Sequence, residues 1–75
     1  MRPTETDVAR EAVRELRDAL RRVGVVLPSL GLDALTLAAD PPRPLVELGR
    51  CTAATARLLA AALMAAALVN EGGRE

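Results

Sequence analysis

The sequence predicts an α+β fold, a small α-β-β-α domain spanning residues 1–75, with a two-stranded antiparallel hairpin between two helices, completed by homodimerisation. Three observations predict it. Apolar residues recur at helical spacing over about 4–23 and again in an Ala-rich run over about 53–70. Apolar residues alternate over about 30–37 and 45–50, with a proline-rich turn between them. The length of 75 residues suits a single domain.

The first helix has recognisable ends. Thr4 can cap its N-terminus, with Asp7 three residues on as the second half of a capping box. Gly24 can close the C-terminus in the left-handed conformation. One apolar stripe runs between these ends, on the residues Val8, Ala12, Val13, Leu16, Ala19, Leu20 and Val23.

The middle of the chain predicts two strands. The apolar alternation over 30–37 changes phase near Asp33, which a bulge would explain; the alternative is a short helical turn capped by Asp33. After the turn, the second strand covers 45–50, where Gly49 would bend the chain or let it pass close to another segment. Glu47 lies inside this strand, either on a solvated outer face or turned inward against an arginine.

The last helix is capped by Thr52 and is apolar almost all round, since only Thr55 and Arg57 interrupt it. A helix of this kind is buried on most faces, and one hairpin and one helical stripe cannot cover it. We therefore expect a homodimer. The candidate interaction surface comprises Leu58, Leu59, Leu63, Met64 and Leu68 of this helix with Leu45 and Glu47 of the hairpin. The apolar run is at the lower limit of length for a membrane span and has no flanking anchors, so we expect no membrane as a partner.

Composition limits the chemistry that the chain can perform. There is no Phe, Trp, Tyr or His, and the one cysteine cannot form an internal disulfide, so oligomerisation remains as the route to stability. Cys51 has no histidine base beside it, and we expect it to be a small core residue. We predict no catalytic, cofactor-binding or metal site, and no enzyme. The first residues hold no apolar stretch, and a lone thiol suits a reducing compartment, so we expect a cytoplasmic location.

The segment 44–51, Pro-Leu-Val-Glu-Leu-Gly-Arg-Cys, with Thr52, Thr55-Ala56 and Leu58-Leu59-Ala60 after it, resembles a group of small actinobacterial proteins of uncharacterised activity. In that group a helix and a V-x-L-P segment lead to a similar strand and an Ala-rich closing helix. The resemblance covers most of the chain and implies a regulatory role, because the members look like companions of transcriptional regulators or mobile elements. It implies no activity and no functional residue.

The function that these features favour is a non-enzymatic protein–protein interaction module, an accessory to a transcriptional regulator or an antitoxin-like protein. One alternative is a small DNA-binding regulator that uses the arginines of the first helix. The zero net charge and the absence of aromatic residues disfavour nucleic acid as a partner. A second alternative is a carrier of apolar small molecules, which would need an enclosed cavity of roughly 300 Å³ or more.

Overall fold

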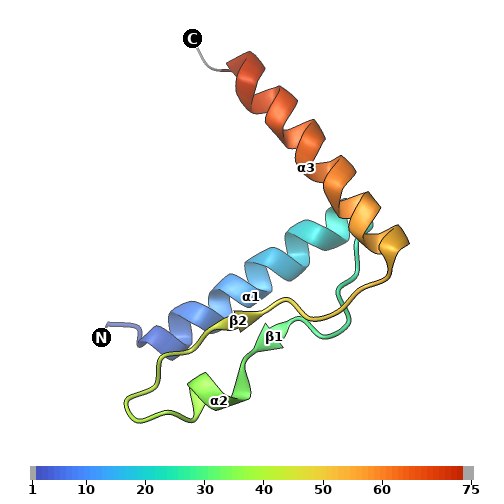
Figure 1. The fold of residues 1–75 in the computed structure, drawn as a ribbon. Helices are drawn as coiled ribbons and strands as arrows, with labels where there is room; N and C mark the ends of the chain where they lie inside the picture. Colours follow the sequence, from blue (N-terminus) through green and yellow to red (C-terminus); the bar gives the residue numbers. More distant parts are fainter. Residues whose placement is uncertain (1, 74–75) are drawn as a thin grey trace.

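The structure is a computed structural model that describes residues 2–73, and within this range it contains three helices and two short strands (Figure 1). In chain order they are α1 (Glu5–Arg22), β1 (Gly31–Leu32), α2 (Ala34–Leu37), β2 (Val46–Glu47) and α3 (Ala53–Gly73). A helix, a two-stranded antiparallel hairpin and a closing helix confirm the predicted α+β class.

Helix α1 begins and ends where the sequence predicts. The Thr4 hydroxyl accepts a hydrogen bond from the Asp7 backbone N–H, and the Asp7 carboxylate accepts one from the Thr4 backbone N–H, both at 3.1 Å. This reciprocal pair is the predicted capping box. At the other end Gly24 adopts φ +77°, and its N–H donates to the carbonyl of Arg21 at 3.1 Å. Gly24 therefore closes the helix in the left-handed conformation, as expected.

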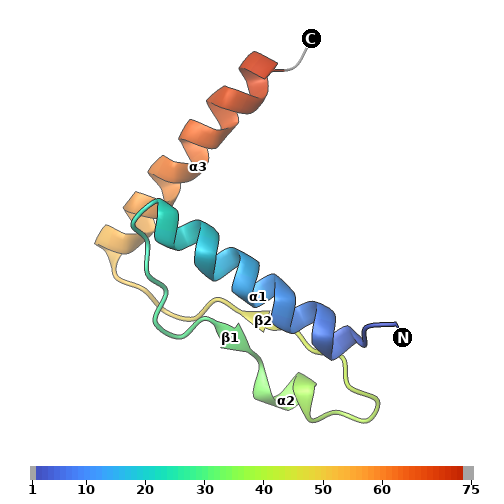
Figure 2. The ribbon, with the colours of Figure 1, turned by 180° about the vertical axis from the view of Figure 1, so that it is seen from behind.

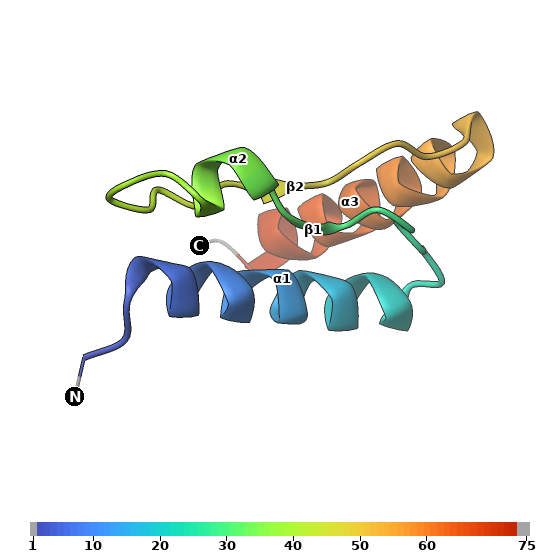
Figure 3. The ribbon, with the colours of Figure 1, turned by 90° about the horizontal axis from the view of Figure 1, so that it is seen from below.

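The hairpin is short and lies against one side of α1, so that the domain has two layers (Figure 3). Strands β1 and β2 are antiparallel, with Gly31 opposite Glu47 and Leu32 opposite Val46. The N–H of the next residue, Asp33, donates to the carbonyl of Leu45 at 2.9 Å and extends the pairing.

The predicted strand over 30–37 is correct only for β1, and the short helical turn that was its alternative forms over the second half. Asp33 caps this turn, α2, because its carboxylate accepts from the Thr36 backbone N–H at 3.0 Å. The local side-chain bond gives the backbone a partner that a strand ladder would otherwise supply. A bulge is therefore not needed to explain the change of phase.

The predicted strand over 45–50 is also shortened, to β2. Gly49 adopts φ +82°, which ends the extended conformation. A Cβ on Gly49 would lie 2.5 Å from the Cβ of Ser29. The chain therefore passes close to the linker, residues 23–30 between α1 and β1, at this point. Both expectations for Gly49, a bend and a close approach, are confirmed.

The core lies between the C-terminal half of α1, the linker and β1. Its buried members are Val13, Leu20, Val25 and Leu30, and the side chains that pack partly buried around them are Leu16, Leu27, Leu32 and Leu59. Ala9, which the predicted stripe omitted, is buried as well. The hairpin is too narrow to cover the whole apolar stripe of α1, so Val8, Ala12, Ala19 and Val23 stay exposed.

Helix α3 leaves the domain at the end of α1 and extends away from it (Figures 1 and 2). The predicted Thr52 cap is confirmed, since its hydroxyl accepts from the Thr55 backbone N–H at 3.1 Å. The helix runs to Gly73, three residues past its predicted end at 70. The radius of gyration is 15.1 Å, whereas a compact chain of this length has about 11 Å. The protein thus has two arms: one is α3, and the other consists of α1 with the hairpin packed on it.

Candidate interaction surface

The predicted surface on α3 is exposed along its length. None of the 18 residues from Ala53 to Asn70 is buried. The large side chains are all more than half exposed: Leu58 53%, Leu63 62%, Met64 66% and Leu68 68%. The structure therefore places these four predicted residues together on one unpartnered helix.

Leu59 is the exception among the predicted residues of α3. It is partly buried and packs against the core cluster. Thr55 and Ala62, four residues before and three after, are partly buried too. These spacings put the three on one helical face. Through this narrow face α3 contacts its own domain, and the other faces of the helix stay exposed.

Leu45 and Glu47 belong to a separate surface. Both are exposed, and β2 lies on the arm of the molecule that α3 leaves behind (Figure 1). Glu47 is therefore on a solvated outer face, which was one of its two interpretations. The structure does not bring the hairpin residues and the residues of α3 into one patch.

A groove along the N-terminal half of α1 is the feature that the sequence analysis missed. One hollow of about 430 Å³ is lined by Pro3, Asp7, Val8, Glu11, Ala12 and Glu15. A second, of about 370 Å³, is lined by Pro3, Glu5, Val8, Ala9, Ala12, Pro44 and Val46. The two share Pro3, Val8 and Ala12, and we call them together the α1 groove. The feature of the sequence that could have predicted this groove is the apolar stripe of α1, which is wider than a two-stranded hairpin can cover.

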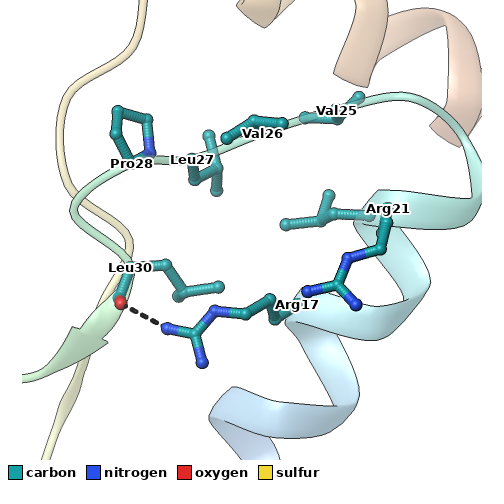
Figure 4. Close-up of a pocket in the computed structure, with 8 residues that line it drawn as sticks. Arg17, Arg21, Val25, Val26, Leu27, Pro28 and Leu30 are labelled. Atoms are coloured by element: carbon teal, nitrogen blue, oxygen red, sulfur yellow. Dashed lines mark hydrogen bonds between the residues drawn. The ribbon is translucent and has the colours of Figure 1, made fainter.

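Another hollow lies between the C-terminal half of α1 and the linker (Figure 4). Here the Arg17 guanidinium reaches across to the hairpin and donates to the carbonyl of Leu30 at 2.8 Å. The hollow has a volume of about 250 Å³, which is below the usual range for ligand pockets. The hollow between α1 and the linker is therefore too small to support the small-molecule carrier.

Cys51 is exposed, so its predicted place in the core is wrong. The reason is that α3, which it precedes, turns away from the domain instead of covering the joint. Within the described part of the chain, no three His, Cys, Asp or Glu side chains come together in a group that could hold a metal ion.

The arginines of α1 stand among acidic neighbours on an exposed face. Arg14 pairs with Glu11 at 3.1 Å, and Arg21 lies 4.0 Å from Asp18. Exposed pairs of this kind contribute little to stability. The acidic side chains between the arginines also lower the local positive charge, whereas a DNA-binding face concentrates it.

By length and composition α3 could cross a membrane, because its window Ala53–Asn70 has a mean hydropathy of 1.6. Core helices of soluble proteins pass the same test. A membrane span and a core helix share one property: each needs an apolar environment around it.

Comparison with protein-family models, with curated proteins and with solved structures finds no match. The resemblance to small actinobacterial proteins therefore stays a prediction.

Proposed function

We propose that the protein is a non-enzymatic interaction module that works as a homodimer in the cytoplasm and docks onto another protein. The observation that carries the proposal is helix α3, which is apolar, more than half exposed at Leu58, Leu63, Met64 and Leu68, and packed on its own domain only along the face of Leu59. Exposed apolar patches larger than a few hundred Å² are typical of protein or membrane interaction sites.

The accessible surface supports a homodimer. The chain exposes 6279 Å², whereas a compact monomer of its mass exposes about 4,400 Å². The excess is about 1,900 Å² per chain, which would give about 3,800 Å² in a dimer. Permanent homodimers bury about 2,000–5,000 Å² in total. One second copy can therefore cover the surface that this chain leaves open.

The hairpin supplies a surface for a further protein partner. Leu35, Leu45 and Leu48 are half exposed or more, on the arm that α3 leaves. The resemblance to companions of transcriptional regulators favours a regulator, or the toxin of an antitoxin-like protein, as this partner.

The homodimer is tested by light scattering of the purified chain at micromolar concentration. We expect a mass of roughly 16 kDa, twice that of one chain. Met64→Glu places a charge on the exposed face of α3 and should return the mass to about 8 kDa. Leu35→Glu, an equal change in α2, should leave the dimer intact. A wild-type mass of about 8 kDa would contradict the proposal.

The partner is tested by affinity purification from the native host, with wild type and Leu45→Glu as matched baits. We expect a protein that the wild type retains and the variant loses, while both remain dimers. Recovery of the bait alone from both preparations would remove the support for a docking role.

A further inference from the structure

Helix α3 has one broad side that its own chain leaves uncovered. Thr55, Leu59 and Ala62, through which the helix contacts its domain, lie on one side. Arg57 and Met64 lie on roughly the opposite side, because successive residues of a helix turn by about 100°. Both are exposed. This outer side of α3 therefore needs a partner that its own chain does not supply.

The charges of α3 are few and evenly placed. Arg57 and Glu71 are the only charged residues in its sequence, and Met64 stands seven residues from each. Seven residues make two turns of a helix less about 20°, so the three positions follow one another along the outer side. One positive and one negative position therefore lie at equal distances, about 10 Å, from Met64.

This spacing determines how two copies of the helix can pair. Two parallel copies would set Arg57 against Arg57 and Glu71 against Glu71. Two antiparallel copies, with a two-fold axis at Met64, place each Arg57 at the level of Glu71 of the other copy. Opposite charges at matched positions favour one direction and one register of a helix pair, whereas like charges disfavour it. The antiparallel pair is therefore the one in which both charges are matched.

The shape of the chain leaves room for this pair. The domain lies on the side of α3 that carries Leu59, and the outer side faces away from it (Figures 1 and 2). Two copies that meet at their outer sides therefore hold their domains on opposite sides of the helix pair, where they do not collide. Ala60, Ala61 and Ala67 flank Met64, and their small side chains let the two helices approach closely.

We propose that α3 forms an antiparallel pair with α3 of a second copy of this chain, with Met64 at the two-fold axis and Arg57 of each copy at the level of Glu71 of the other. The inference rests on the proposed function, since it names the surface, direction and register through which the homodimer forms. The pair covers part of the surface by which this chain exceeds a compact monomer. The α1 groove and the hairpin lie outside the pair and stay open to the further protein partner.

A second copy explains the outer side of α3 better than a lipid bilayer does. The apolar window of 18 residues is about 27 Å long, a little short of the roughly 30 Å hydrocarbon core. It contains Arg57, and the chain has no Trp or Tyr to anchor at the interface. A bilayer would also leave the equal spacing of Arg57 and Glu71 about Met64 without a use.

The first test exchanges the charges. Arg57→Glu sets like charges against each other at both ends of the pair, so it should raise the dissociation constant of the dimer about tenfold at low salt. Glu71→Arg should do the same. Both changes in one chain restore opposite charges and should return the constant to within about threefold of wild type. A parallel pair predicts no loss in either single variant, because each charge already faces its like there.

The matched controls are equal changes of charge outside α3. Arg50→Glu and Asp40→Arg, both at exposed positions, should change the dissociation constant less than about threefold. The effect of Arg57→Glu should also shrink when the salt is raised to about 1 M, where charges are screened beyond roughly 3 Å. Sedimentation equilibrium measures each constant, and circular dichroism verifies that the variants keep their helices.

The second test is a disulfide between two chains that each carry one cysteine. In a Cys51→Ser background, one chain carries Ala60→Cys and the other Ala67→Cys. In the antiparallel pair these positions differ in level by only about 2 Å, so oxidation of the mixture should give a covalent dimer with one chain of each kind. Two chains with Ala60→Cys hold their thiols about 12 Å apart in level and should not cross-link, whereas in a parallel pair they would.

The outcomes separate the two proposals. A wild-type dimer in which reversal at Arg57 acts no differently from reversal at Arg50 overturns this inference and leaves the homodimer standing. The same holds if the Ala60→Cys chains cross-link with each other and the mixed pair does not. A chain that is monomeric in water overturns both proposals. A monomer that sediments with phosphatidylcholine vesicles identifies a bilayer as the occupant of α3 and also overturns both.

Discussion

At the scale of single residues, two glycines set the path of the chain. Gly24 and Gly49 both have positive φ, at +77° and +82°. Gly24 turns the chain out of α1 into open space, because nothing lies within 4 Å of a Cβ built on it. Gly49 bends the chain against the linker, where a Cβ would meet Ser29. The same backbone conformation therefore has a different steric cost at the two sites.

This difference predicts an order of stability. Gly24→Ala should lower the free energy of unfolding by about 1–2 kcal/mol, the cost of a left-handed alanine. Gly49→Ala should cost more, because the new methyl group also collides with Ser29. Gly31→Ala, with open space and no positive φ, is the control. Urea unfolding at one protein concentration measures all three, and equal losses for Gly24→Ala and Gly49→Ala would contradict the close approach.

Arg17 is the one arginine of α1 that the structure shows bonded to the hairpin, through the carbonyl of Leu30 at 2.8 Å. Arg17→Met keeps the aliphatic stem and removes the donor, so we expect a loss of about 1 kcal/mol in unfolding free energy. Arg21→Met, which removes only an exposed contact of 4.0 Å with Asp18, should change it by less than about 0.5 kcal/mol. If thermal unfolding ranked the two variants in the opposite order, Arg17 would not tie the layers together.

At the scale of elements, local hydrogen bonds decide where each helix and strand ends. The capping box fixes the start of α1, and Thr52 fixes the start of α3. Asp33 ends β1 by capping α2, so the apolar alternation that continues through 37 never becomes a ladder. The strands are short because this cap and the bend at Gly49 limit the paired length to two residues on each side.

The role of Asp33 can be tested directly. Asp33→Ala removes the acceptor for the Thr36 N–H and should lower the free energy of unfolding by about 1 kcal/mol. Asp40→Ala, in the exposed turn that follows, should have little effect. Denaturant titration of the two variants compares them, and amide exchange at Thr36 shows where the loss occurs. Unchanged protection at Thr36 in Asp33→Ala would show that the cap does not hold α2.

At the scale of the whole molecule, the chain is larger and thinner than its length requires. Its dimensions are 43 × 34 × 15 Å, and none of the residues from Ala53 to Asn70 is buried. The buried core is small and reaches α3 only through Leu59. Stability on this architecture should depend on the partner copy as much as on the fold of one chain.

The midpoint of thermal unfolding should therefore depend on protein concentration. For a dimer of this size, a tenfold rise in concentration should raise the midpoint by about 3–5 °C. Met64→Glu, if it yields a folded monomer, should show a lower midpoint and no such dependence. Calorimetry over two decades of concentration measures both, and a constant wild-type midpoint would show that one chain is stable alone.

The sequence by itself determined the two long helices, the caps at Thr4, Gly24 and Thr52, the hairpin between these helices and the special role of Gly49. These are local properties: the spacing of apolar residues, a capping side chain or a glycine acts within a few residues of itself. It also determined that the last helix has more apolar surface than one chain can cover, because that follows from composition. Five of the seven predicted surface residues lie on α3, and four of those five are free.

Only the tertiary structure decided how the apolar surfaces are divided. The pattern of α1 cannot show that the linker and the hairpin cover Val13 and Leu20 but leave Val8 and Ala12 exposed. It also cannot show that α3 turns away, exposes Cys51 and touches the core cluster through Leu59. These outcomes depend on contacts between segments far apart in the chain, where the width of one element sets how much of another it can bury.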